Sequence, residues 1–372
     1  MKTALILNNT HSEFEFIKFL KKKYDKVFTL GNQIPFLKEK KIQHFKLDYK
    51  NSKKINAIIN KYKILHIFPG SNDLTLFSLS KLKNKFVDDI KKVRILHNKF
   101  FFRKFEKDIK IISWQSIKNN KKTKYPILLK PKIGHGGKGI AKIENEVELK
   151  KILKKNKKNF FLEEYKNGTH HGVFTLICKQ KLVFTFFDTE QRFINPFTVS
   201  STINSCLIPQ KIQKKIKNKI SSIAKKLKLA DGILHLQIIY NSKEKKFYIV
   251  EITRRMPGDN YLTFIKRSTN LPVEEYIYNL FLNKKLKIKK QHKKFILRKV
   301  LMSSKNGRYR GVKISRKIIN NIIEKKIFVK KNYKINDFMQ KRLGVIFLKF
   351  KNEKLMVSFA KNIDNHINVI IK

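Results

Sequence analysis

The residues best suited to chemistry lie in one short segment, Lys130-Pro-Lys-Ile-Gly-His-Gly-Gly-Lys138-Gly139, which follows an apolar, strand-like run. Glycine lets the backbone adopt positive φ and approach a ligand closely, so successive N–H groups can point at one anion. The lysine at the strand end adds a mobile positive charge. We expect this segment to bind nucleotide phosphates, with a flexible hairpin as the alternative. The lysine precedes the glycines and no helix follows directly, which excludes a P-loop and a dinucleotide fingerprint.

A second group of polar side chains lies on a predicted β-hairpin that turns through residues 241–246. Side chains alternate between the faces of a strand, so His235 and Gln237 share one face, as do Glu251 and Thr253. A symmetric turn places Gln237 opposite Glu251, with Cβ atoms about 4.5–5.5 Å apart. Such hard oxygen ligands suit Mg²⁺, which shares phosphate oxygens with the protein. We therefore predict a metal site at this face.

Arg255 follows the hairpin and is placed to meet charge that develops on a transferring phosphoryl group. The alternative is a solvent-facing strand with a surface Arg–Glu pair. Because the strand runs into the turn Met256-Pro-Gly258-Asp259, we favour the functional role. We expect this turn to shape an acceptor pocket, with Arg255, Gly258 and Asp259 near the substrate.

The N-terminal part of the chain alternates short apolar strands with amphipathic helices, which predicts a parallel α/β sheet. The predicted strands cover residues 4–7, 27–30 and 64–68, and the predicted helices cover residues 14–24 and 74–86. Asp73 lies after the third strand. It either belongs to a ligand site at the carboxyl edge of the sheet or caps the following helix.

The remainder of the chain has an α+β pattern, with antiparallel hairpins beside helices. The predicted elements are a strand at 160–165, a hairpin of 173–178 with 182–187, a helix at 209–229, the hairpin above, and late strands at 345–350 and 355–359. The late strands indicate a small C-terminal β-rich unit.

Composition adds a formal net charge of +59 over 372 residues, mostly from lysine. Lysine is spread along the whole chain and rises together with Asn, Ile and Phe, as A/T-rich codon usage would produce. We therefore expect only weak, salt-sensitive, non-specific polyanion binding. No apolar run approaches the ~20 residues that span a bilayer. We therefore expect no membrane association. Cys178 and Cys206 fit no metal or redox spacing, which favours a reducing cytoplasm.

The motifs described below, and their order along the chain, resemble those of the ATP-grasp superfamily of ATP-dependent carboxylate–amine ligases. The resemblance covers residues 98–281 and implies that Lys99 and Lys130 reach the nucleotide phosphates. It makes the glycine-rich loop a mobile lid formed by Gly134, His135, Gly136, Gly137, Lys138 and Gly139. It also implies that the Glu163 side chain and the Glu164 and Tyr165 backbone read adenine, and that Glu251-Ile-Thr-Arg-Arg255 matches the metal-binding motif.

Three positions depart from the family pattern. His170 stands where a glutamate usually binds the ribose hydroxyls, Gln237 replaces the first metal-binding acid, and Thr253 replaces an asparagine. Each new side chain can still hydrogen-bond or supply a ligand atom. Gln237 and Thr253 together remove one negative charge from the metal site, so we expect weaker metal binding and a greater dependence on Glu251.

The resemblance implies an α/β N-terminal domain with a parallel sheet (1–97), an α+β ATP-grasp domain (98–290) and a small C-terminal β-rich subdomain (291–372). The mobile lid subdomain would cover about 115–165, within the ATP-grasp domain. Trp114, just before it, is expected in a core. The predicted catalytic set is Arg255, His235 and Lys130, with His235 contacting the substrate rather than acting as a base.

The hypothesis is an ADP-forming ligase that uses ATP and Mg²⁺ to join a small carboxylate to an amine through an acyl phosphate. Arg192 either clamps the substrate carboxylate or belongs to an exposed charged loop. A homodimer is a candidate assembly. The alternatives are an ATP-grasp kinase or carboxylase on a small substrate, a polyanion-binding protein with a vestigial ATP site, or a scaffold protein.

Overall fold

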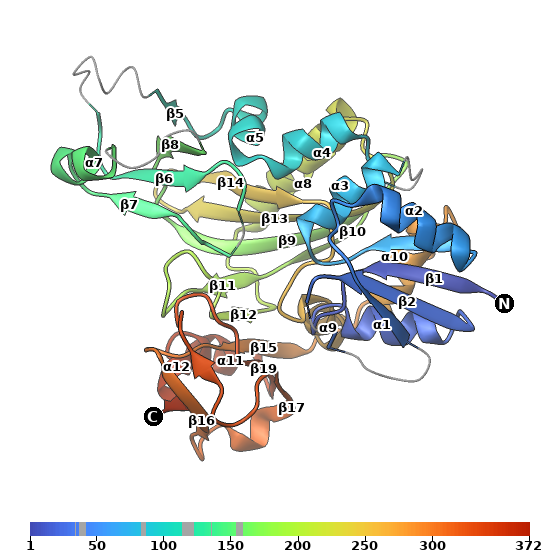
Figure 1. Ribbon diagram of the computed structural model, residues 1–372. Coiled ribbons are helices and arrows are strands. Elements are labelled where there is room, and N and C mark those ends of the chain that lie inside the picture. The colour runs from blue at the N-terminus through green and yellow to red at the C-terminus, as the bar shows by residue number, and fades with distance from the viewer. Residues whose placement is uncertain (34, 37–41, 83–86, 114–122, 135, 154–158) are drawn as a thin grey trace.

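A computed structural model describes the protein except residues 34, 37–41, 83–86, 114–122, 135 and 154–158 (Figure 1). Trp114, His135 and part of the predicted lid lie outside the described residues. Figure 1 shows an N-terminal sheet, a small lid sheet on the opposite side, a long central sheet, and C-terminal strands below. The chain therefore has the predicted class, a parallel α/β part followed by antiparallel α+β parts.

The N-terminal part is a four-stranded parallel sheet in the order β3-β2-β1-β4. Its elements are β1 (Thr3–Leu7), α1 (Phe14–Lys21), β2 (Lys26–Gly31), β3 (Ile42–Lys46), α2 (Ser52–Lys61), β4 (His66–Pro69) and α3 (Asp73–Lys81). The three strands and two helices predicted here are confirmed, except that the second helix ends at Lys81, and its predicted residues 83–86 lie outside the described part of the chain. β3 and α2 were missed, because β3 has polar residues among its apolar ones and α2 is rich in lysine. Every residue of β1 is buried, as expected for an inner parallel strand.

The lid sheet is antiparallel, in the order β5-β8-β6-β7. Two helices lead into it, α4 (Ile90–His97) and α5 (Lys99–Glu106). Its own elements are β5 (Ile111–Ile112), β6 (Ile127–Pro131), β7 (Ala141–Ile143), α7 (Glu146–Leu153) and β8 (Phe160–Glu164). The glycine-rich segment joins β6 to β7, and this position gives the loop access to the central sheet.

The central sheet has nine strands in the order β14-β13-β9-β11-β12-β15-β19-β17, with β10 also paired to β9. The strands are β9 (Thr169–Cys178), β10 (Lys181–Phe187), β11 (Thr189–Gln191), β12 (Ser201–Ile203), β13 (Gly232–Asn241), β14 (Lys246–Thr253), β15 (Phe295–Leu301), β17 (Ile322–Ile327) and β19 (Gly344–Phe350). Helix α8 (Gln210–Lys226) packs its isoleucines on one face of β13. Helices α9 (Tyr261–Thr269) and α10 (Val273–Phe281) follow β14. The other face of β13 and β14 carries the predicted site.

The C-terminal part adds β16 (Gly307–Ile314), η1 (Ile319–Asn321), β18 (Lys334–Ile335), α11 (Glu353–Ala360), α12 (Ile363–His366) and β20 (Ile367–Ile371). β16, β18 and β20 form a small sheet. The strand predicted at 355–359 is wrong, because these residues lie in α11. The Asn352 side chain caps that helix by accepting from the Leu355 N–H, and Met356 and Ala360 are buried one turn apart.

Strand β15, which belongs to the predicted C-terminal subdomain, pairs with β12 and so extends the central sheet. The domain boundaries at 97/98 and 290/291 stay predictions. No helix within the described part of the chain is long and apolar enough to cross a membrane.

Candidate active site

Lys99 connects the glycine-rich loop to the β13–β14 hairpin. It is the first residue of α5, a helix whose N-terminus is capped by the side chain of Asn98. Its Nζ donates to the Gly134 carbonyl oxygen at 2.6 Å and lies 3.2 Å from Oε1 of Glu251. The loop predicted to hold phosphates and the carboxylate predicted to hold a metal therefore meet at one buried ammonium group.

Lys130, near the end of β6, belongs to a buried ion cluster. Its Nζ lies 2.6 Å from Glu163 Oε1, and Arg103 Nε donates to Glu163 Oε2 at 2.8 Å. Burial tends to raise the pKa of Glu163, but the charges of Lys130 and Arg103 outweigh it and hold that pKa below its ordinary value. The carboxylate predicted to accept from adenine is thus engaged with two cations. The adenine contacts of the Glu164 and Tyr165 backbone stay predictions.

Arg103 also ties the lid sheet to the hairpin. The β13–β14 pairing has a bulge between Gln237 and the next residue of β13. At this bulge, Arg103 Nη1 donates to the Ile249 carbonyl at 2.7 Å and Nη2 to the Val250 carbonyl at 3.1 Å. Bulges commonly lie next to active sites and re-aim side chains. Here the bulge immediately precedes Glu251, so Arg103 helps to set the direction of that carboxylate.

The glycine-rich loop contacts the segment that follows β11. The Gly136 carbonyl accepts from Thr198 Oγ1 at 2.8 Å. Gly137 has φ of +75°, and a Cβ there would lie 2.7 Å from Cβ and the carbonyl oxygen of Phe197. Only glycine permits both this conformation and this approach. Gly139 is also in the left-handed region, and Lys138 is exposed. The predicted lid mobility stays a prediction.

The predicted metal face has the register expected from the sequence. Gln237 pairs with Glu251, and His235 pairs with Thr253. Gln237 Nε2 donates to Glu190 Oε1 at 3.3 Å, and Thr253 Oγ1 is buried with no hydrogen-bond partner within the described residues. No group of three or more His, Cys, Asp or Glu is positioned for a metal in the described part of the chain. Any metal here would depend on amide and hydroxyl oxygens as well as carboxylates.

Glu190 is a carboxylate that sequence reasoning did not assign to this face. It pairs with His170 across β9 and β11. Its side chain accepts a hydrogen bond from Gln237, which pairs with Gly172 on the far side of β9. A Cβ at Gly172 would lie 2.5 Å from Asp188 Oδ2, so the missing side chain provides room for the Asp188 carboxylate. A strand glycine often marks such a close approach, and Gly172 was the available sequence clue.

Asp188 is a fully buried carboxylate beside this face. It accepts hydrogen bonds from the Gly172 N–H and from the Tyr261 hydroxyl. Burial, together with the charge of Glu190, raises the pKa of Asp188 to about 7. The His235 ring centroid lies 5.0 Å from that of Tyr261, and burial lowers the pKa of His235 to about 3. A neutral His235 suits the predicted substrate contact, which stays a prediction.

This raised pKa predicts a pH-dependent stability. Folded Asp188 keeps its proton up to about pH 7, whereas the ordinary value is 3.8. Between these two pH values, folded Asp188 binds more protons than unfolded Asp188. The stabilisation from Asp188 is therefore greatest at low pH and is lost as the pH rises through 7. Asp188→Asn should flatten the fall in the free energy of unfolding between about pH 4 and 7, measured by urea titration. Glu106, whose pKa burial also raises to about 7, should leave a residual slope. An unchanged slope in the variant would contradict this assignment.

The segment with Asp188, Glu190 and Arg192 is largely buried, which excludes the exposed-loop alternative. Arg192 Nη2 donates to Glu190 Oε2 at 3.0 Å. His170 lies across from Glu190, and burial together with the charge of Arg192 lowers its pKa to about 3. His170 Nδ1 has no hydrogen-bond partner within the described residues. Its predicted contact with ribose stays a prediction.

Arg255 forms an ion pair with Asp73, and its predicted contact with a phosphoryl group stays a prediction. Its Nε donates to Asp73 Oδ1 at 2.7 Å and its Nη2 to Asp73 Oδ2 at 3.3 Å. The preceding Arg254 donates from Nε to Asp88 Oδ2 at 2.7 Å. Both arginines thus anchor residues of the N-terminal region. Asp73 does not cap α3, because the cap is Asn72.

The turn after β14 contacts both ends of the chain. Asp259 Oδ2 lies 3.3 Å from Arg342 Nε, and Asp259 Oδ1 lies 3.8 Å from His11 Nε2. The Asp259 carbonyl accepts from Arg298 Nη1 at 3.0 Å. A Cβ at Gly258 would lie 4.0 Å from Ser12 Oγ. Arg298 and Arg342 were not predicted, because nothing local links them to this turn.

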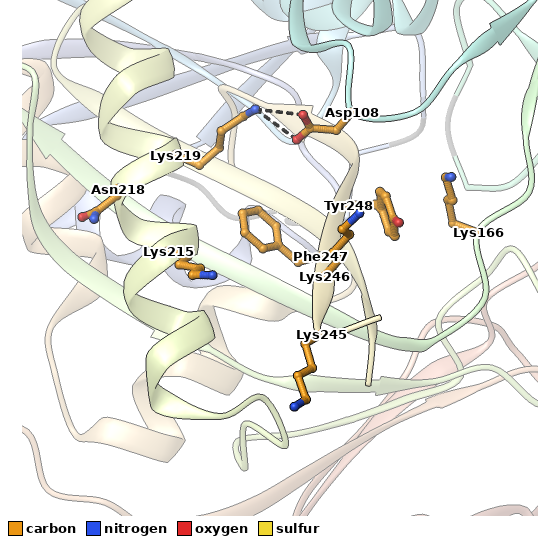
Figure 2. Close-up of a pocket in the computed structure, with 9 residues that line it drawn as sticks. All are labelled: Asp108, Lys166, Lys215, Asn218, Lys219, Lys245, Lys246, Phe247 and Tyr248. Atoms are coloured by element: carbon orange, nitrogen blue, oxygen red, sulfur yellow. Dashed lines mark hydrogen bonds and ion pairs between the residues drawn. The ribbon is translucent and has the colours of Figure 1, made fainter. Parts of the chain in front are cut away.

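A separate open pocket of about 690 Å³ lies between α8 and the edge of β14 (Figure 2). Its lining combines lysines with two aromatic side chains: Asp108, Lys166, Lys215, Asn218, Lys219, Lys245, Lys246, Phe247 and Tyr248. Lys219 and Asp108 form an ion pair across it. None of the predicted site residues lines this pocket.

Comparison with known proteins identifies a domain family. Residues 97–259 match the model of a family described as the ATP-grasp domain. A search of curated proteins finds no match.

Solved structures resemble the whole chain at low sequence identity. The L-amino acid ligase from Bacillus licheniformis has a TM-score of 0.79 at 13% identity, covering 100% of this chain and 99% of that one. The N5-carboxyaminoimidazole ribonucleotide synthetase from Thermotoga maritima has a TM-score of 0.76 at 14% identity, covering 100% of both chains. Phosphoribosylglycinamide synthetase from Anaerococcus prevotii has a TM-score of 0.75 at 16% identity, also covering 100% of both. These likenesses establish a shared fold.

Proposed function

We infer that this protein, a member of the ATP-grasp superfamily through its residues 97–259, is an ADP-forming ligase that joins a small carboxylate to an amine. The observation that carries the proposal is the Lys99 ammonium group. It contacts the glycine-rich loop at Gly134 and the hairpin carboxylate Glu251 together. A triphosphate held between a glycine loop and a carboxylate-bound cation needs this adjacency.

The oxygen atoms on the hairpin fit a divalent cation. Glu251 supplies a carboxylate, Gln237 an amide oxygen, and Thr253 a buried hydroxyl without a partner in the described chain. When bound there, Mg²⁺ would neutralise phosphate charge during phosphoryl transfer. Glu251, Gln237 and Thr253 are the residues that would hold it.

The protein's own residues would position the reactants. Lys99 and Lys130 would bind phosphate oxygens, and the glycine-rich loop would cover them and exclude water. A substrate carboxylate oxygen attacks the γ-phosphorus, and the bond to the bridging oxygen breaks to release ADP. The amine then attacks the acyl carbon, loses a proton and expels phosphate. Arg192, buried beside Glu190, is the proposed contact for the substrate carboxylate.

The test is the release of ADP and phosphate across a panel of carboxylates and amines, with the products identified by mass spectrometry. An amide product supports the ligase. A stable phosphorylated or carboxylated product would instead indicate a kinase or carboxylase on the same fold. Absence of both ATP binding and substrate-dependent turnover would overturn the proposal.

One observation favours a second candidate, polyanion binding. The pocket in Figure 2 gathers five lysines beside two aromatic side chains, a combination that suits phosphate-bearing chains. This candidate predicts nucleic-acid binding that falls steeply with salt and is unaffected by Lys130→Ala. The ligase predicts that ATP binding depends on Lys130.

A further inference from the structure

Asp73 links the N-terminal sheet to the candidate active site. The sequence leaves two roles open for this residue, a ligand site at the carboxyl edge of the sheet or the cap of α3. The cap is the Asn72 side chain, which accepts from the Leu74 N–H. Asp73 is the first residue of α3 and is 8% exposed. Its carboxylate is therefore free to serve a neighbouring segment instead of its own helix.

The Asp73 carboxylate contacts two basic residues of the candidate site. Oδ1 accepts from Arg255 Nε at 2.7 Å and Oδ2 accepts from Nη2 at 3.3 Å, and this pair of bonds fixes the plane of the guanidinium group. Oδ2 also lies 3.8 Å from Nδ1 of His97, two residues before Lys99. Burial tends to raise the pKa of Asp73, but the charges of Arg255 and His97 hold it below its ordinary value. Asp73 is thus an anion among the cations of the site.

Arg255 also lies within the electrostatic reach of the carboxylate on the proposed metal face. Burial tends to lower the pKa of Arg255, but the charges of Asp73 and Glu251 outweigh it and raise that pKa. A third carboxylate, Glu13, acts on Arg255 as well, but it already accepts hydrogen bonds from the loops after β1 and β4. Without Asp73, Glu251 would therefore be the carboxylate left to pair with Arg255.

The adjacent pair of Arg254 and Asp88 provides an internal comparison. Arg254 Nε donates to Asp88 Oδ2 at 2.7 Å, and both side chains are almost fully buried. The other donors of Arg254 bond to the carbonyl groups of Ile233 and Ala230. None of these partners is a predicted site residue. The chain therefore has two similar buried pairs side by side, and one of them reaches the site.

We propose that Asp73 is a positioning residue of the ligase, which holds the Arg255 guanidinium group in place and keeps it from pairing with Glu251. Three of the five guanidinium N–H groups bond to Asp73 and to the Met256 carbonyl. No described residue accepts from the other two, one on each Nη, so they can bind an oxyanion of the reactants. Glu251 stays available to the metal. This inference rests on the proposed function and adds to it a residue of the N-terminal part of the chain.

The test measures ADP affinity by calorimetry on the full chain, once with Mn²⁺ and once with EDTA. Mn²⁺ is the probe of the metal site, and the difference between the two affinities reports the contribution of the metal. The variants are Asp73→Asn, Asp73→Glu and the matched control Asp88→Asn. Both asparagine variants remove the anion beside a buried arginine, so both should lower the free energy of unfolding. ADP affinity distinguishes positioning from a structural role that the two pairs share.

Mn²⁺ should tighten ADP binding to the wild type and to Asp88→Asn, with affinities that agree within about twofold. Asp73→Asn should weaken ADP binding with Mn²⁺ at least about tenfold, the usual cost of losing a residue that orients the groups around a metal. With EDTA its effect should be less than about threefold, because Arg255 then has no metal to displace. Asp73→Glu keeps the charge but moves the carboxylate, so its loss should be intermediate. This variant decides the question if Asp73→Asn fails to fold.

The double variant Asp73→Asn/Arg255→Met shows whether Asp73 acts through Arg255. Arg255→Met removes the cation that would compete for Glu251. In that background, the loss of Asp73 should change ADP affinity with Mn²⁺ by less than about threefold, since the effects of residues in contact are not additive.

Three outcomes contradict the inference. Folded Asp73→Asn binds ADP with Mn²⁺ as Asp88→Asn does, its loss persists undiminished beside Arg255→Met, or Mn²⁺ does not tighten ADP binding to the wild type. Turnover keeps the two proposals apart. Absence of substrate-dependent turnover beside the expected ADP affinities would count against the ligase alone. Turnover with the same kcat and KM in Asp73→Asn and Asp88→Asn would count against Asp73 alone.

Discussion

Glu251→Gln is expected to lower ATP turnover at least about 100-fold, the usual cost of losing a group that stabilises charge in the transition state. Gln237 supplies an amide, so Glu251 is the one carboxylate that the proposed metal site on the β13–β14 hairpin has. The substitution also removes the negative partner of Lys99, 3.2 Å away. Turnover is measured by ADP release, and nucleotide affinity is measured separately by calorimetry.

The control is Glu244→Gln, on the turn of the same hairpin. Glu244 is exposed and contacts Asn241 and Tyr248 at the far end from the site. This variant should retain turnover within about twofold, because exposed contacts of this type contribute little. If Glu251→Gln behaved like Glu244→Gln, the metal face would lie elsewhere.

Glu163→Ala is expected to lower the free energy of unfolding by about 3–5 kcal/mol, the typical cost of breaking a buried ion pair. The substitution leaves Lys130 and Arg103, both almost fully buried, without their shared carboxylate. Arg103 would also hold the bulge carbonyls of Ile249 and Val250 less firmly. The measurement is urea unfolding at constant pH.

Glu164→Ala is the matched comparison, one residue along the same strand. Its side chain is 39% exposed and pairs with Lys166 on the surface. Its loss should cost less than about 1 kcal/mol. Equal destabilisation by the two substitutions would show that the Glu163 cluster contributes no more than a surface pair.

Features that depend on residues close together along the chain were predicted best from the sequence. The pairing of Gln237 with Glu251 follows from side-chain alternation and a short turn, and the structure has that register. Three of the four parallel N-terminal strands, β1, β2 and β4, were recognisable as short apolar runs. The strand predicted at 355–359 is wrong because a short apolar cluster fits the periodicity of a helix as well as that of a strand. The Asn352 cap favours the helix.

Long-range contacts could not be predicted. Arg298 joins the site only because β15 lies beside β12, a neighbour about 100 residues earlier. Glu190 reaches Gln237 only because the fold places β11 and β13 on either side of β9. The second cation on Glu163, Arg103, comes from α5, where the sequence assigned a role to Lys99 alone.

The adjacent Arg254 and Arg255 bond to Asp88 and Asp73, which both precede the predicted boundary at residue 97. A fragment that began at residue 98 would retain two buried guanidinium groups without their counter-ions. A fragment that ended at residue 97 would expose two aspartates that the whole protein covers. Division of the polypeptide at this boundary therefore separates these charges from their partners, so we expect expression of either half alone to be a poor substitute for the intact chain.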